Sequence, residues 1–110
     1  MRTMASVIIP SHRGAERLGR LLSWLAAQTY PHWEAVVVVD GIVDDSLRVI
    51  EAARGDGLPV RSVSFSENRG RSAALNAGLA ASSGDILIRC DDDLEVPPAW
   101  IEAHVALHAV

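Results

Sequence analysis

Three consecutive aspartates, Asp91, Asp92 and Asp93, directly follow a short apolar stretch of the chain. Neighbouring carboxylates repel one another and lose hydration where a buried strand ends, so stability alone gives little reason for this placement. A hard cation relieves the repulsion, and Mg²⁺ is usually held by one or two carboxylates together with substrate phosphates. The triplet therefore predicts a site for Mg²⁺ or Mn²⁺, with a solvated acidic turn as the alternative.

A fourth acid and several arginines follow other apolar stretches. Asp40 comes after one of them, and Arg13, Arg69 and Arg71 lie close to the ends of two more. A guanidinium group pairs bidentately with phosphate oxygens, so arginines beside a metal-binding acid cluster suit a polyanion such as a nucleoside diphosphate. For each single arginine, a surface ion pair is the structural alternative.

The composition excludes several classes of function. All ten basic residues are arginines, which rules out Walker A loops, Schiff bases and the lysine switch of receiver-like signalling domains. The formal net charge is -4 and no basic run is present, so nucleic acid is not an expected partner.

The histidine and cysteine content argues against a zinc site or a disulfide. His104 and His108 have the spacing of half a zinc helix, but Val105 stands where a catalytic glutamate would follow the first histidine. Cys90 is the single cysteine, which excludes an internal disulfide and favours a reducing, cytoplasmic setting.

Membrane association of a longer parent protein stays open, although no apolar run in this segment is long enough to span a bilayer.

Apolar runs and helical periodicity alternate along the sequence. Continuous apolar runs rich in β-branched residues predict strands over residues 5–9, 35–39, 60–65 and 85–90. Apolar spacing and Pro or Gly boundaries predict helices over residues 15–28, 44–53, 72–81 and 98–108, with Ser72 as a helix cap. This order predicts a doubly wound, Rossmann-like α/β fold with a parallel sheet.

The predicted sheet brings the polar segments together. Ligands of open α/β sheets bind outside the carboxyl ends of the strands, near the point where the strand order reverses. The segments after the four predicted strands are 10–13, 40–41, 67–71 and 91–93, which hold the acids and arginines described above. With 110 residues and 49% hydrophobic content, residues 1–110 are expected to form one domain.

Several segments of the chain resemble family 2 glycosyltransferases of the GT-A fold. The resemblance lies in Pro-Ser-His-Arg at 10–13, Gln-Thr-Tyr-Pro at 28–31, Val-Val-Asp-Gly at 38–41, Glu-Asn-Arg-Gly at 67–70, the Ala, Asn and Gly residues of 73–78, and the Asp triplet followed by Pro-Pro-Ala-Trp at 97–100. Each motif is weak alone, but together they keep the family's order and spacing over nearly the whole chain.

The resemblance implies a role for each matching residue. The residues implied to bind a nucleotide sugar are Pro10, Ser11, His12, Arg13, Asp40, Asn68, Arg69, Gly70, Arg71, Asn76, Asp91 and Asp92. Asp40 matches the acid that contacts the base and ribose, and Arg71 matches a basic residue near the donor. Asp91 and Asp93 match the outer acids of an Asp-X-Asp motif and are the implied metal ligands. Because Asp92 is also acidic, the register of ligation within the triplet stays open.

The implied reaction is inverting transfer of a glycosyl group, with UDP-sugar as the expected donor. The acceptor would be a hydroxyl group of a sugar, a lipid or another molecule. In the family, the catalytic base and the acceptor surface lie in a second half after the Asp-X-Asp motif, so residues 1–110 are expected to be the donor-binding portion. No catalytic base is assigned. A non-catalytic nucleotide-binding module stays open as an alternative, as does a receiver-like signalling domain, against which the lack of lysine argues.

The sequence departs from the family pattern after its second predicted strand. The family usually has Asp-Asp-Gly-Ser-Thr-Asp there, whereas this chain has Val39 for the first acid and Ile42 and Val43 for the hydroxyl residues. His12 replaces the usual aromatic or hydroxyl residue and is expected to stack on the base or to hydrogen-bond with it.

Self-association is a further expectation. In the family the strand matching residues 85–90 is paired on both sides, so an open edge is expected here, which is a template for pairing with another chain. Trp100, Ile101 and Leu107 on the last helix are expected to lose part of their cover. A two-fold homodimer through these elements would close both surfaces.

Overall fold

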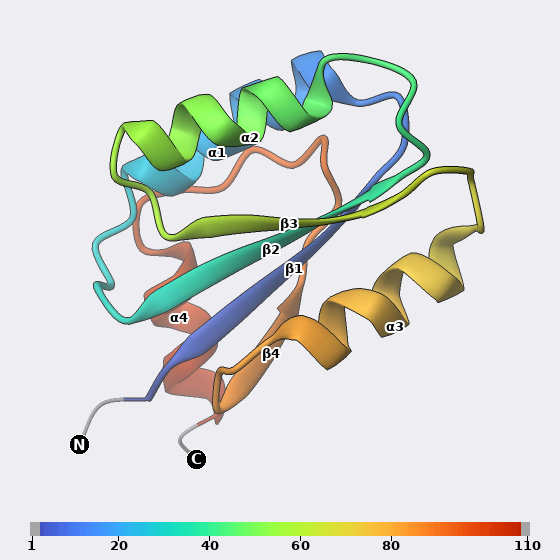
Figure 1. Cartoon of the computed structure of the whole chain (residues 1–110). Helices are drawn as coiled ribbons and strands as arrows, with labels where there is room; N and C mark the ends of the chain where they lie inside the picture. The colour runs from blue at the N-terminus through green and yellow to red at the C-terminus, as the bar shows by residue number, and fades with distance from the viewer. Residues whose placement is uncertain (1–2, 109–110) are drawn as a thin grey trace.

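Strands and helices alternate strictly in the computed structural model, which describes residues 3–108 (Figure 1). The elements are β1 (Ala5–Ser11), α1 (Ala15–Ala26), β2 (Trp33–Asp40), α2 (Ser46–Gly55), β3 (Val60–Phe65), α3 (Arg71–Ala81), β4 (Ile86–Arg89) and α4 (Trp100–His108). The four strands form one parallel sheet in the order β3-β2-β1-β4. This arrangement confirms the predicted doubly wound α/β fold.

The strand order reverses beside β1. From β1 the chain moves outward through β2 to β3, and it then returns to place β4 on the other side of β1. The crevice between the carboxyl ends of β1 and β4 is where ligands of doubly wound sheets bind.

Helices cover both faces of the sheet, with α1 and α2 on one face and α3 on the opposite face (Figure 1). The predicted apolar stripe of α1, which comprises Leu18, Leu21, Leu22 and Leu25, is buried in the main core with alternate residues of β1 and β2. This double cover explains why β1 and β2 consist largely of continuous apolar residues.

The α3 helix approaches the sheet closely because Gly78 has no side chain. A Cβ atom at this position would lie 2.4 Å from Cγ2 of Ile8 and 3.2 Å from Cγ2 of Val38. The small residues of this segment, which contribute to the family resemblance, therefore have a packing role.

The Gln-Thr-Tyr segment at 28–30 holds the end of α1 against α4. Gln28 Nε2 donates to the carbonyl of Pro97 at 2.7 Å, and Gln28 Oε1 accepts from the backbone N–H of Ile101 at 2.9 Å. The hydroxyl of Tyr30 donates to the carbonyl of Thr3. This part of the resemblance therefore reflects how α4 is positioned and lies away from the sheet's carboxyl edge.

Some predicted boundaries differ from the structure. Helix α1 ends at Ala26, earlier than predicted, while β1 continues to Ser11. The prediction that Ser72 caps α3 is wrong, because the helix begins at Arg71 and is preceded by Gly70, with no side-chain cap. No helix within residues 3–108 combines the length and apolar character needed to cross a bilayer.

We expect Gly78→Ala to lower the free energy of unfolding by about 1–2 kcal/mol. The clash with Ile8 should outweigh the gain of about 1 kcal/mol that alanine brings to a helix interior. Gly19→Ala is the matched control in α1, because a Cβ there would meet only Cγ1 of Val49, at 3.8 Å. Urea denaturation should show Gly19→Ala to be neutral or stabilising, and equal behaviour of the two variants would contradict the packing role of Gly78.

Self-association through β4 stays a prediction. Within residues 3–108, β4 pairs with β1 alone, and Leu87 is 45% exposed. Ile101 is fully buried, so only Leu107, at 73% exposure, leaves a large apolar surface on α4. Sedimentation velocity should show association that grows with concentration and that Leu87→Lys weakens, because lysine disfavours pairing at sheet edges. A monomer across the whole concentration range would contradict this prediction.

Candidate functional site

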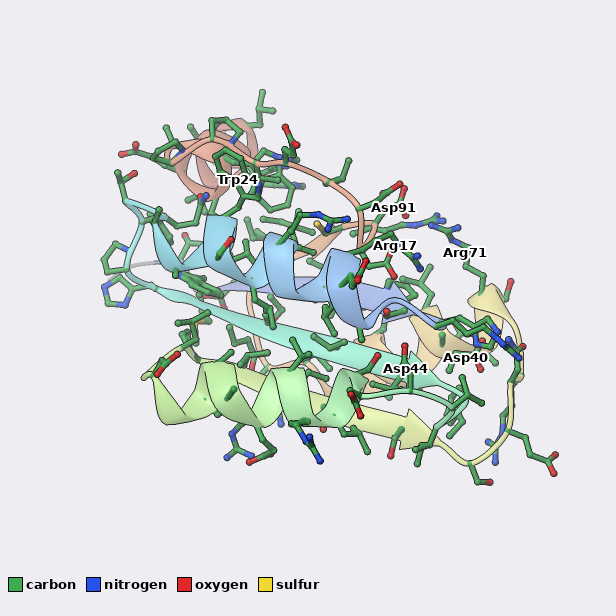
Figure 2. The ribbon with its side chains drawn as sticks, turned by 90° about the horizontal axis from the view of Figure 1, so that it is seen from above. Arg17, Trp24, Asp40, Asp44, Arg71 and Asp91 are labelled. Carbon is green, nitrogen blue, oxygen red and sulfur yellow. The ribbon has the colours of Figure 1, made fainter. Side chains whose placement is uncertain are left out.

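A cavity of about 260 Å³ lies at the carboxyl edge of the sheet. Its lining residues are Pro10, Ser11, His12, Arg17, Asp40, Asn68, Gly70, Arg71, Ala74 and Asp92. Figure 2 shows Arg17, Asp40, Arg71 and Asp91 pointing toward this end of the molecule. Residues from four separate loops or helix starts thus meet where the doubly wound fold places its ligands.

Most of the residues predicted to bind a nucleotide sugar line this cavity, but five of the predicted site residues do not. The exceptions are Arg13, Arg69, Asn76, Asp91 and Asp93. Asn76 is exposed on α3, and the guanidinium of Arg69 lies 4.5 Å from the ring centre of Phe65. Contacts of these residues with a ligand stay predictions.

Asp40 joins the end of β2 to the loop that follows β3. The residue is only 4% exposed, and its two carboxylate oxygens accept the backbone N–H groups of Arg69 at 2.6 Å and Gly70 at 3.0 Å. A carboxylate shielded from water needs such donors. Asp40 therefore fixes the Asn68–Gly70 side of the cavity while its remaining lone pairs stay available.

His12 is oriented by the main chain of the neighbouring strand. Its Nδ1 atom lies 2.7 Å from the carbonyl oxygen of Asp40. A carbonyl oxygen only accepts hydrogen bonds, so Nδ1 carries the hydrogen and Nε2 of the neutral ring is an acceptor.

The next residue, Arg13, has a left-handed backbone (φ 52°), which costs a non-glycine residue roughly 1–2 kcal/mol. Such strain is common in loops that shape binding sites.

Asp44 connects the starts of α1 and α2. Its Oδ1 atom accepts from the Oγ of Ser46 at 2.6 Å, and its Oδ2 atom accepts from the backbone N–H of Ala15 at 3.2 Å. The hydrogen bond from Ser46 holds the pKa of Asp44 below its usual value, despite the opposing effect of burial. Asp44 thereby orders the loop that carries Ile42 and Val43, which are 48% and 54% exposed and lie outside the cavity lining.

The three aspartates of the triplet have different surroundings. Asp91, with a side chain that is 48% exposed, pairs with Arg71. Asp92 is 13% exposed and pairs with Arg17, with a Nε–Oδ1 distance of 3.1 Å. Asp93 is exposed, and its side chain makes no hydrogen bond or ion pair with any other residue in the described part of the chain.

Arg17 lines the cavity although it is not among the site residues expected from the sequence. Arg17 comes from the first turn of α1 rather than from a strand end, so the rule based on strand ends does not find it. Its position in the first turn of the predicted helix could have indicated a nearby acid, because a cation is unfavourable at the positive end of a helix dipole unless an acid compensates it. The hydrogen bond and charge of Asp92 raise the pKa of Arg17 above its usual value.

The acids offer hard oxygen ligands without forming a complete metal cage. Within residues 3–108, no group of three or more His, Cys, Asp or Glu side chains is arranged to hold a metal ion. Mg²⁺ commonly takes only one or two carboxylates and completes its shell with phosphates and water. Half-exposed Asp91 and exposed Asp93 fit that smaller requirement.

The family model for glycosyl transferase family 2 matches residues 6–109. This chain belongs to glycosyl transferase family 2. It is 35% identical over 105 residues to the undecaprenyl-phosphate 4-deoxy-4-formamido-L-arabinose transferase of Klebsiella pneumoniae, covering 92% of this chain and 32% of the relative. It is 32% identical over 105 residues to the dodecaprenyl-phosphate galacturonate synthase of Rhizobium johnstonii, with 92% and 31% covered.

Solved structures agree with this assignment. TarS 1-349 of S. aureus in complex with UDP-GlcNAc superposes with a TM-score of 0.85 at 25% identity, covering 96% of this chain and 31% of that chain. The mannosyltransferase PcManGT of Pyrobaculum calidifontis, in complex with GDP-Man and Mn²⁺, has a TM-score of 0.81 at 28% identity, with 88% and 29% covered. The family 2 chain described here spans about a third of the length of the curated relatives above.

We expect Cys90 to react slowly with thiol reagents in the folded chain. Burial, reinforced by the charges of Asp91, Asp92 and Asp93, raises the pKa of the Cys90 thiol to about 12. Only the thiolate is nucleophilic, so at pH 8 about one molecule in 10⁴ would be reactive, against roughly a quarter for an ordinary cysteine. Labelling in metal-free buffer with and without urea tests this expectation, and equal rates would contradict it.

Proposed function

We propose that this chain is the donor-binding portion of an inverting glycosyltransferase that uses a nucleoside-diphosphate sugar, with UDP-sugar as the first candidate. The observation that carries the proposal is the cavity at the carboxyl edge, which is lined by Asp40, Arg17, Arg71 and Asp92, with Asp91 paired to Arg71 beside it. Acids and guanidinium groups around one cavity suit a ligand with a polar base and ribose at one end and phosphates at the other.

The chain's own residues would divide the donor between them. His12, Asp40 and Asn68 would face the base and ribose, and Arg71 would pair with the phosphates. Asp91 and Asp93 would hold Mg²⁺ or Mn²⁺ together with the diphosphate. When bound, the cation supplies charge stabilisation for the departing nucleoside diphosphate. The complexes of TarS with UDP-GlcNAc and of PcManGT with GDP-Man and Mn²⁺ support a nucleotide-sugar donor and a divalent cation.

In the proposed reaction, the oxygen of an acceptor hydroxyl bonds to the anomeric carbon from the side opposite the diphosphate. The bond from that carbon to the diphosphate oxygen breaks in the same step, so the configuration inverts. We assign no base for the acceptor proton to any described residue. The names of both relatives include a polyprenyl phosphate, so a polyprenyl phosphate is the first acceptor to test. With that acceptor, an ionised phosphate oxygen would take the place of the hydroxyl oxygen, and no acceptor proton would need a base.

We expect UDP to bind more tightly when Mn²⁺ is present, and Asp93→Asn to remove this metal-dependent gain. The substitution keeps the shape of the side chain and deletes the charge that the cation requires. Calorimetric titration with UDP, GDP and dTDP, each with and without Mn²⁺, measures the gain and the base preference. Asp56→Asn is the matched control, because Asp56 is an exposed acid at the end of α2.

An unchanged response to Mn²⁺ in Asp93→Asn would overturn the metal assignment. Failure of all three nucleotides to bind the parent chain would overturn the donor-binding proposal itself. A separate assay for UDP released from UDP-sugar in the presence of an acceptor distinguishes an enzyme from a nucleotide-binding module.

A further inference from the structure

The carboxylate of Asp92 joins the segment after β4 to the β1–α1 segment at the carboxyl edge of the sheet. Its Oδ2 atom accepts from the Oγ of Ser11 at 2.8 Å and from Nη2 of Arg17 at 3.3 Å. Its Oδ1 atom accepts from Nε of Arg17 at 3.1 Å. Both oxygens are therefore engaged by groups from the β1–α1 segment, in the bidentate geometry that makes arginine–carboxylate pairs strong.

The start of α1 is shaped to receive this carboxylate. A Cβ atom on Gly14 would lie 2.3 Å from Oδ2 of Asp92 and 2.6 Å from the Oγ of Ser11. Glycine at this position therefore leaves the room that the carboxylate of Asp92 and the hydroxyl of Ser11 occupy. Arg17 Nη2 also donates to the carbonyl of His12 at 3.1 Å, which extends the contact to the loop beside the base side of the cavity.

These contacts separate Asp92 from its two neighbours. Asp91 is half-exposed with Arg71 as its partner, and Asp93 is exposed, so both can turn toward a ligand. Both carboxylate oxygens of Asp92 already accept hydrogen bonds, from the guanidinium of Arg17 and the hydroxyl of Ser11. Moving it to a metal would leave Arg17 without its acid near the positive end of α1, which is unfavourable.

We propose that Asp92 and Arg17 are positioning residues for the donor site. Their ion pair fixes the segment that carries Asp91 and Asp93 against the loop that carries Ser11 and His12. The pair thereby sets the distance between the metal-binding acids and the base side of the cavity. This inference rests on the proposed function of donor binding.

We expect substitutions of this pair to change UDP affinity without removing its dependence on Mn²⁺. Asp92→Asn and Arg17→Gln should each weaken UDP binding about tenfold, as is typical when a residue that orients a metal site is lost. Both variants should nevertheless keep the gain in UDP affinity on addition of Mn²⁺, whereas Asp93→Asn should lose it. Arg17→Lys, which retains the charge but not the bidentate geometry, should fall between the parent and Arg17→Gln.

The double variant tests whether the two residues act as a pair. Arg17→Gln with Asp92→Asn should bind UDP no more weakly than Arg17→Gln alone, because the second change removes the carboxylate left unpaired by the first. Arg20→Gln is the matched control on α1, since Arg20 is exposed and its side chain makes no hydrogen bond or ion pair in the described part of the chain. Calorimetry on variants shown to be folded by circular dichroism gives the affinities, and urea denaturation gives their stabilities in parallel.

Four outcomes would overturn the inference. Loss of the Mn²⁺ gain in Asp92→Asn would make Asp92 a metal ligand. Lower stability with parental UDP affinity in both Asp92→Asn and Arg17→Gln would reduce the pair to a purely structural role. A parent chain that binds UDP while all these variants match Arg20→Gln would remove the positioning role but keep the proposed function, whereas a parent that binds no nucleotide would overturn both.

Discussion

A carboxylate that is shielded from water needs donors around it, and at the carboxyl edge of this sheet the donors come from neighbouring loops. Asp40 at the end of β2 takes backbone N–H groups from the segment before α3. Asp92 after β4 takes the hydroxyl of Ser11 and the guanidinium of Arg17. Each acid therefore ties its own loop to another one. The walls of the cavity are held in place by contacts within the chain, so a ligand meets a site that is largely formed.

The fold was predictable where burial on both sheet faces constrains the sequence. The run from Val36 to Val39 has no polar position because helices cover β2 on both faces, and that pattern is typical of a central parallel strand. The helix boundaries depend on long-range hydrogen bonds, which the pattern of apolar residues does not reveal. Ser72 has the chemistry of a cap, but Gly70 precedes α3 with φ 96°, a backbone suited to glycine, and bonds to Asp40.

The site was predictable to the extent that it is made of strand-end loops. Ser11 and Asp40 end β1 and β2, Asp92 follows β4, and all three meet because the carboxyl ends of parallel strands share one edge. Arg17 lies on α1, whose stripe of leucines was predictable. Its partner Asp92, however, is 75 residues away in sequence. Only the three-dimensional structure shows that the middle acid of the triplet is already paired while Asp93 is exposed.

The most direct test of this account is a crystal structure of the chain with UDP and Mn²⁺. The account predicts that the diphosphate lies over the carboxyl ends of β1 and β4, that Mn²⁺ is bound by carboxylate oxygens of Asp91 or Asp93, and that the Arg17–Asp92 pair is retained. Mn²⁺ bound by Asp92 with Arg17 displaced, or UDP bound away from the carboxyl edge of the sheet, would contradict it.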